Sequence, residues 1–179
     1  LRCGRFPRPA PGWERDARLN WHDVVTIAHI SDPHVGSPYF VPNLMNRVIV
    51  ELNELEPDVV ICSGDLTNEG YRQEYKNWVA YAGRIRAPMF TVPGNHDHYT
   101  YQTVRRKLFE NTFPHWLEGE RIGDHQYPFA RNVGGYWFIA VNSSVPNVIL
   151  IDSRGGVGWQ QRRRLEELLK RLPPGPRIL

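Results

Sequence analysis

The chain has 179 residues, of which 41% are hydrophobic, 23% charged and 12% aromatic. These values are typical of a globular domain and exclude a fibrous or low-complexity chain. No apolar run approaches the roughly 18 residues that a membrane-spanning helix needs, so we expect a chain that stays outside the membrane, in the cytoplasm. The two cysteines, Cys3 and Cys62, have no metal-ligand or redox spacing, which excludes a disulfide framework and a zinc ribbon.

The net charge of +3 comes entirely from the first 22 residues. This stretch holds five arginines against two acidic residues, contains three prolines, and shows neither helical nor strand periodicity. We therefore predict a disordered Pro- and Arg-rich extension over residues 1–22, with a basic arm that touches nucleic acid as the alternative. Residues 23–179 carry 17 basic and 17 acidic residues, so nucleic acid is not a favoured partner of the domain.

Strands and helices alternate from residue 23 to about residue 99. Short β-branched apolar runs that end in polar loops are typical of buried strands, and apolar residues spaced by three and four predict amphipathic helices. The strands are predicted at residues 24–30, 59–62 and 89–92, and the helices at residues 42–55 and 71–85. Parallel strands need crossover connections of this kind, so the pattern predicts a mostly parallel sheet with helices on its faces.

The second half of the chain predicts an antiparallel element. The predicted elements are a helix over 100–111, strands over 127–132 and 136–142 joined by a Gly-Gly turn, and a charged amphipathic helix over 159–172. Residues 177–179 resemble the opening of a strand that is cut off. Together these patterns predict an α/β fold in a single domain over residues 23–179.

Metal-type side chains follow each of the three predicted parallel strands. Asp32 and His34 follow the first strand, Asp65 follows the second, and Asn95 and His96 follow the third. The carboxyl ends of parallel strands meet at one edge of a sheet, so we expect these side chains to converge. Carboxylate, imidazole and amide ligands without thiolates suit Mn, Fe, Zn or Mg.

This set of side chains predicts a binuclear hydrolase site. Asp65, on the middle strand, can offer its two oxygens to two ions, and a metal pair clamps a phosphoryl group and lowers the pKa of a bound water. His96 is the candidate general acid for the leaving oxygen, with the side chain of Asn68 as the candidate that holds its ring. Asp32 and His34 are two residues apart, so an extended loop would place both on one side. Pro33 should restrict Asp32 to an extended backbone.

Three segments of the chain resemble the sequence motifs of a known family. They are DPH at residues 32–34, GDLTN at residues 64–68 and GNHD at residues 94–97. They look like the signature of the calcineurin-like metallophosphoesterases, most closely of their bacterial phosphodiesterase branch, which includes the class III cyclic-nucleotide phosphodiesterases. The resemblance implies a layered α/β/β/α sandwich.

The resemblance also implies roles for individual residues. Asp32, His34 and Asp65 would bind the first metal, Asp65 and Asn95 the second, and His96 would act on the leaving group. Family members have three further histidines, one after a later strand and two in a Gly-His-x-His loop, and this sequence has none of them. The chain therefore resembles the N-terminal portion of the domain, with the C-terminal part missing.

Two functions of different classes remain open. The first is metal-dependent hydrolysis of a phosphoester, in particular a phosphodiester, with two divalent ions (Mn, Fe or Zn) in the complete domain. Its substrate would be a small phosphoester, with a nucleotide as one option. The second is an incomplete, non-catalytic scaffold domain that binds metal weakly and serves as a partner in a complex.

Several residues near the motifs have simpler interpretations. His29 lies inside an apolar strand, and we predict a hydrogen-bonded core residue. We predict a solvated loop position for His98, with contact to the substrate as the alternative. The basic residues Arg105, Arg106 and Lys107 are interpreted as a solvated helix face, with a wall for a nucleotide or sugar phosphate as the alternative.

Overall fold

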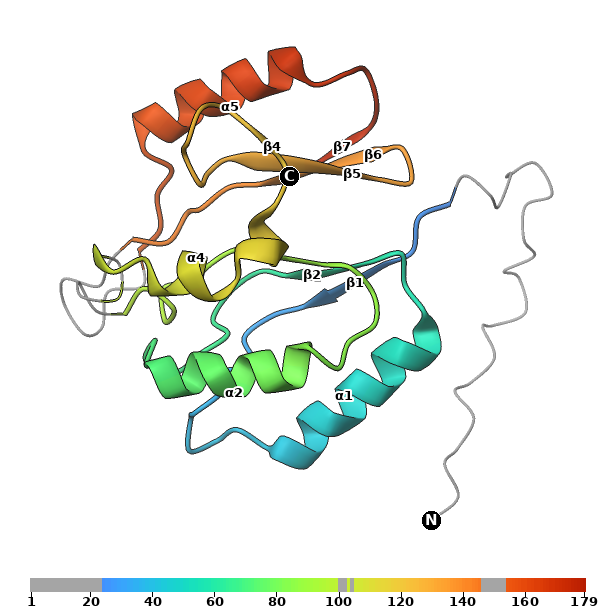
Figure 1. Ribbon diagram of the computed structural model, residues 1–179, viewed down its shortest axis with the longest axis vertical. Helices are drawn as coiled ribbons and strands as arrows, with labels where there is room; N and C mark the ends of the chain where they lie inside the picture. Colours follow the sequence, from blue (N-terminus) through green and yellow to red (C-terminus); the bar gives the residue numbers. More distant parts are fainter. Residues whose placement is uncertain (1–23, 100–102, 104, 146–153) are drawn as a thin grey trace.

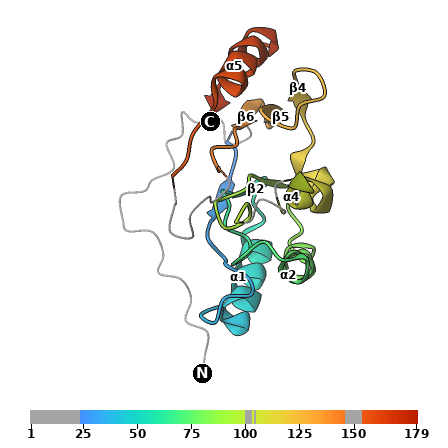
Figure 2. The same ribbon diagram turned by 90° about the vertical axis from the view of Figure 1, so that its left-hand side faces the viewer.

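The computed structural model of the chain describes residues 24–99, 103, 105–145 and 154–179 (Figure 1). The predicted extension over residues 1–22 lies outside the described residues. Two β-sheets lie face to face, with helices α1 and α2 on the outer side of the first sheet and α5 on the outer side of the second (Figures 1 and 2). This order of layers confirms the predicted α/β/β/α sandwich.

The first sheet is parallel and three-stranded, as predicted. Its strands are β1 (Ile27–Ile30), β2 (Val59–Cys62) and β3 (Met89–Thr91), in the order β1-β2-β3. In the middle strand, Val59, Val60 and Cys62 have no exposed surface. A run without polar alternation is what a strand covered on both faces requires.

Helices α1 (Pro42–Leu55) and α2 (Arg72–Ala82) connect these strands and cover the sheet. Helix α1 begins at Pro42, whose fixed φ suits a first helical position, and it buries Met45, Ile49 and Leu52 along one stripe. At the start of α2, the side chain of Glu74 accepts a hydrogen bond from the backbone nitrogen of Tyr71 at 2.9 Å. These helices fix where each following strand begins.

The predicted helix over residues 100–111 is not continuous, because Thr103 and Arg105 are helical but residues 106–107 form a turn. Residues 100–102 and 104 lie outside the described residues, and Lys107 has a left-handed backbone (φ 49°), which a continuous helix does not allow. Helix α4 therefore begins at Leu108 and ends at Thr112, and the 3₁₀ helix η2 (Pro114–Leu117) follows it. The basic side chains before α4 are exposed, which agrees with a solvated surface.

The second sheet has four strands in the order β4-β5-β6-β7. The predicted hairpin is confirmed as β5 (Phe129–Val133) and β6 (Tyr136–Ala140), while the two-residue strand β4 (Glu120–Arg121) was not predicted. Strand β7 (Arg177–Ile178) pairs parallel to β6. Helix α5 (Trp159–Arg171) covers the outer face, where Leu168 and Leu172 pack with Ala130 and Ile139.

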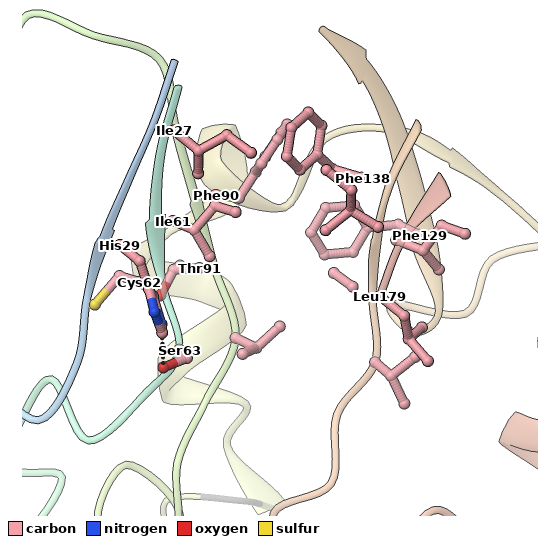
Figure 3. A pocket seen from close by; sticks show the side chains of 15 residues that line it. Ile27, His29, Ile61, Cys62, Ser63, Phe90, Thr91, Phe129, Phe138 and Leu179 are labelled. Atoms are coloured by element: carbon pink, nitrogen blue, oxygen red, sulfur yellow. Dashed lines mark hydrogen bonds between the residues drawn. The ribbon is translucent and has the colours of Figure 1, made fainter. Parts of the chain in front are cut away.

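The inner faces of the two sheets meet around Phe90 and Phe138, whose ring centroids are 5.6 Å apart. Beside this contact, an apolar cavity of about 440 Å³ opens between the sheets (Figure 3). His29 is hydrogen-bonded, as predicted, but it lines this cavity and is exposed. The predicted core placement is wrong, because β1 is an edge strand facing the cavity. None of the helices in the described part of the chain combines the length and apolar character that a membrane span requires.

Candidate metal centre

The loops that follow β1 and β2 continue side by side beyond the ends of the strands. The backbone nitrogen of Asp32 donates to the Gly64 oxygen at 3.1 Å, and that of His34 donates to the Asp65 oxygen at 3.0 Å. These bonds prolong the parallel pairing into the loops. They hold the predicted ligands of two loops next to one another.

Three of the predicted ligands have a left-handed backbone: Asp32 (φ 54°), His34 (φ 44°) and Asp65 (φ 51°). The prediction that Pro33 keeps Asp32 extended is therefore wrong, since the loop-to-loop hydrogen bonds fix the backbone instead. A left-handed residue other than glycine costs on the order of 1–2 kcal/mol. Strain of this kind persists where the surrounding structure over-determines it, and it gathers at functional sites.

The side chains of these residues converge. His34 Nε2 lies 3.7 Å from Asp32 Oδ1 and 3.8 Å from Asp65 Oδ2. His34, Asp65 and His96 each offer a ligand atom within 4.8 Å of the others. Ligand atoms bound to one ion at about 2.0–2.2 Å stand roughly 3–4 Å apart, so the donor set fits a divalent cation. Asn95 joins Asp32 and Asp65 in the lining of a cavity of about 200 Å³.

His96 is held from both of its sides. Its Nδ1 lies 2.6 Å from the backbone oxygen of Asn68, and its ring stacks on Tyr99 at 5.7 Å. The contact therefore comes from the main chain of Asn68, and not from the side chain as the sequence suggested. A carbonyl oxygen only accepts, so Nδ1 carries the proton and Nε2 remains for chemistry at the cluster. The backbone nitrogen of His96 also donates to Asp65 Oδ1 at 2.9 Å.

Asp97 ties the second loop to the third, a role the sequence did not indicate. Its Oδ1 accepts from the backbone and hydroxyl of Thr67 (3.0 and 2.9 Å), and its Oδ2 accepts from the backbone of Leu66 and Gly94 (3.2 and 3.0 Å). The carboxylate is completely buried, and this desolvation raises the pKa of Asp97 to about 6 against the opposing effect of the hydrogen bonds. The four hydrogen bonds of the Asp97 carboxylate thus link the loop after β2 to the loop after β3.

Two glycines permit the close approach of these loops. A Cβ on Gly94 would lie 2.0 Å from Asp65 Oδ1, and a Cβ on Gly64 would lie 2.4 Å from the Gly94 nitrogen. Both distances are far below van der Waals contact. Asp65 can therefore reach the third loop only because these positions are glycines.

His98 is buried, with 4% of its surface exposed, so the prediction of a solvated loop position is wrong. Its Nδ1 lies 2.7 Å from Ser144 Oγ, and its Nε2 lies 3.7 Å from Glu110 Oε1. Burial raises the pKa of Glu110, but the interaction with the nearby His98 ring outweighs this effect, and the net shift is downward. His98 thus joins α4 to the segment that follows β6, beside the cluster.

A family model of calcineurin-like phosphoesterases matches residues 25–177. The chain belongs to the calcineurin-like phosphoesterase family. This membership confirms the resemblance seen in the three motifs and, at the level of the family, the predicted class of metal-dependent phosphoesterases. The motif residues of this family member are those that converge at the ends of β1, β2 and β3.

Named relatives point in the same direction. The chain is 30% identical over 159 residues to a probable glycerophosphodiester phosphodiesterase of Arcobacter nitrofigilis, covering 82% of this chain and 52% of the relative. It is 27% identical over 171 residues to a probable cyclic nucleotide phosphodiesterase of a Pseudoalteromonas species, covering 88% and 55%. The chain thus spans about half the length of these two relatives.

A solved structure shares the fold. It is a dimetal phosphatase from Danio rerio, which matches with a TM-score of 0.57 at 14% identity over 82% of this chain and 65% of that one. At this identity the match supports the layered α/β fold alone.

Proposed function

We propose that this phosphoesterase hydrolyses a small phosphodiester with the help of two divalent ions held at the carboxyl ends of β1, β2 and β3. The observation that carries the proposal is the convergence of Asp32, His34, Asp65 and His96, with donor atoms at the spacing that a cation requires. The two relatives described above are named for phosphodiester substrates, which supports a diester over a monoester.

Four residues would hold the ions. Asp32, His34 and Asp65 would bind the first, and Asp65 and Asn95 the second, with Mn, Fe or Zn suited to this set of oxygen and imidazole ligands. When bound, divalent ions supply positive charge to the phosphoryl oxygens and lower the pKa of a bound water. The left-handed backbones of Asp32, His34 and Asp65 fix where these side chains leave the main chain, which reduces the backbone reorganisation that binding requires.

His96 would supply the proton for the leaving oxygen. Its Nδ1–H is donated to the Asn68 backbone oxygen, so only Nε2 can carry the transferable proton. The stacked ring of Tyr99 and the edge contact with His34, at 4.6 Å between centroids, restrict the rotation of the imidazole. A general acid needs such a fixed position relative to the leaving group.

The cavity of about 200 Å³ is the proposed substrate site. Ser143, Ser144 and Arg154 line it together with Asp32 and Asp65. The planar guanidinium of Arg154 can donate two parallel hydrogen bonds to phosphoryl oxygens, which suits a phosphate ester as the substrate. A nucleotide is one candidate of the right chemistry.

Hydrolysis of matched aryl esters tests the proposal. With added Mn²⁺, the chain should cleave an activated aryl phosphodiester faster than the corresponding monoester, and chelation should stop the reaction. The exposed Asp124, between β4 and β5, provides a control, since Asp124→Asn should retain full activity. Metal binding without hydrolysis of either ester would instead support the scaffold alternative.

A further inference from the structure

A chain of hydrogen bonds runs from the cavity between the sheets to Asp32. His29 Nε2 lies 2.9 Å from Ser63 Oγ, and Ser63 Oγ donates to Ser31 Oγ at 3.1 Å. Ser31 Oγ in turn donates to Asp32 Oδ2. Figure 3 shows the first of these contacts at the wall of the cavity. The chain therefore crosses from β1 to the end of β2 and returns to the loop after β1.

The carboxylate fixes the direction of every proton in this chain. An ionised carboxylate only accepts, so Ser31 must give its single hydroxyl proton to Asp32. Ser63 must then give its own proton to Ser31, which leaves its oxygen to accept. His29 therefore donates from Nε2, and all three hydrogen bonds point toward the carboxylate.

The two oxygens of Asp32 have different neighbours. Oδ2 accepts from Ser31, whereas Oδ1 faces His34 Nε2 at 3.7 Å, on the side of the metal cluster. The Asp32 side chain is 61% exposed, so packing alone does not hold its rotamer. We propose that His29, through Ser63 and Ser31, is a positioning residue that keeps Oδ1 of Asp32 directed at the first metal. This inference rests on the metal role of Asp32 proposed above.

The contacts of His29 do not support a purely structural role in holding the sheet together. Strands β1 and β2 are already joined by backbone pairing from Ile27 and Val59 to Ile30 and Cys62, so a side-chain link adds little to the sheet. His29 is exposed in the cavity, and its replacement removes no packed core group. Partners that orient a metal-binding side chain typically change metal affinity by 10–100-fold when they are removed.

Two amide variants of His29 test whether a donor at the position of Nε2 is what matters, rather than the size of the side chain. The amide nitrogen of Gln reaches the place of imidazole Nε2, whereas that of Asn reaches only the place of Nδ1. On the full chain, Mn²⁺ titrated by calorimetry should bind His29→Asn about tenfold more weakly than the wild type, and His29→Gln within about threefold of it. The melting temperatures of the metal-free proteins should agree, because no buried contact is lost.

Further variants make the test decisive. Ser63→Ala should weaken Mn²⁺ binding as His29→Asn does, and the double variant should be no weaker than either alone, because both break the same chain. The exposed His125→Gln is the matched control and should bind normally. Wild-type affinity in His29→Asn, or equal losses in the Asn and Gln variants, would overturn the proposal.

Asp32→Ala distinguishes the proposed ligand role of Asp32 from the positioning role of His29. If Asp32→Ala binds Mn²⁺ like the wild type, the proposed ligand role itself is wrong. If Asp32→Ala weakens binding while His29→Asn and Ser63→Ala do not, the ligand role stands and the positioning role fails. In an Asp32→Ala background, His29→Asn should have no further effect on Mn²⁺ affinity.

Discussion

The two sheets of this member of the calcineurin-like phosphoesterase family differ in the role of the loops that follow their strands. In the first sheet, the loops after β1 and β2 carry the proposed ligands Asp32, His34 and Asp65 on left-handed backbones, and the buried carboxylate of Asp97 joins the loop after β2 to the loop after β3. The second sheet is held by apolar packing of α5, and among the described residues its part of the cavity lining comes from the segment after β6, which includes Ser144. The first region, which we call the ligand platform, thus provides the proposed metal ligands, and the second region packs against it and completes the lining of the cavity.

The largest expected effect is at Asp65, the centre of the first region. Asp65→Ala removes the carboxylate shared by both proposed ions and should reduce metal-dependent hydrolysis to background while the fold is retained. Its Oδ2 lies 3.8 Å from His34 Nε2 and its Oδ1 accepts from the His96 backbone nitrogen, so its loss removes contacts to both neighbouring loops. Activity assays with circular dichroism check this result. Retained activity at normal metal content would refute a two-metal site.

The second largest loss of activity is expected on substitution of His96. Loss of a general acid costs on the order of a hundredfold for esters with poor leaving groups and far less for activated aryl esters. His96→Ala should therefore show a steep dependence of its rate defect on leaving-group pKa. If both classes of ester lose activity equally, His96 holds structure or metal instead.

Asp97 and Leu168 provide a matched comparison between the regions. Asp97→Asn places an amide nitrogen against buried backbone donors and should cost about 2 kcal/mol of unfolding free energy. Leu168→Ala, at a 2% exposed position under α5, should cost a similar 2–3 kcal/mol through a cavity. Only Asp97→Asn should also weaken Mn²⁺ binding, by calorimetry at a temperature where both variants are folded. Equal effects on metal affinity would remove the distinction between the regions.

Arg154 tests whether the second region reaches the substrate. If its guanidinium binds phosphoryl oxygens in the cavity, Arg154→Ala should raise KM about tenfold with a smaller change in kcat, since one charge-assisted pair is worth about 1.5–3 kcal/mol at most. Mn²⁺ affinity should stay unchanged. An unchanged KM would place the substrate elsewhere in the cavity.

The smallest expected effect is at Glu110, which joins the two regions through His98. The folded-state pKa of Glu110 is lowered, so its pairing stabilises the fold above the ordinary carboxyl pKa of about 4.5. That contribution should be lost as the pH falls through the folded-state pKa. The difference in unfolding free energy between the wild type and Glu110→Gln should therefore shrink as the pH falls below about 4.5. A constant difference from pH 7 to pH 3 would contradict the pairing.

Much of the first region could be predicted from the sequence, because its signals are local. Buried strands and amphipathic helices have strong periodicity, and the polar residues after each strand must meet at one sheet edge. The loop conformations could not be predicted, since the left-handed backbones of Asp32 and Asp65 depend on hydrogen bonds between segments about 30 residues apart. For the same reason, the sequence did not predict that Asp97 joins the second and third loops or that His98 is buried.

The second region was predicted less well. The hairpin had a local signal in its Gly-Gly turn, and α5 had its charged amphipathic pattern. Strand β4 has only two residues, too few to show any alternation, and forms because β5 offers it a paired edge. The contacts between the regions, such as His98 with Ser144, involve residues 46 positions apart and have no signature in the sequence.

The most direct test of the ligand platform is an anomalous difference map from a crystal of this chain soaked in Zn²⁺. We predict a peak about 2.0–2.2 Å from Asp32 Oδ1, His34 Nε2 and a carboxylate oxygen of Asp65, at the ends of β1 and β2. The same soak of Asp65→Ala should lose this peak. Zinc bound only at other residues, or a peak that persists in Asp65→Ala, would contradict the proposed metal centre.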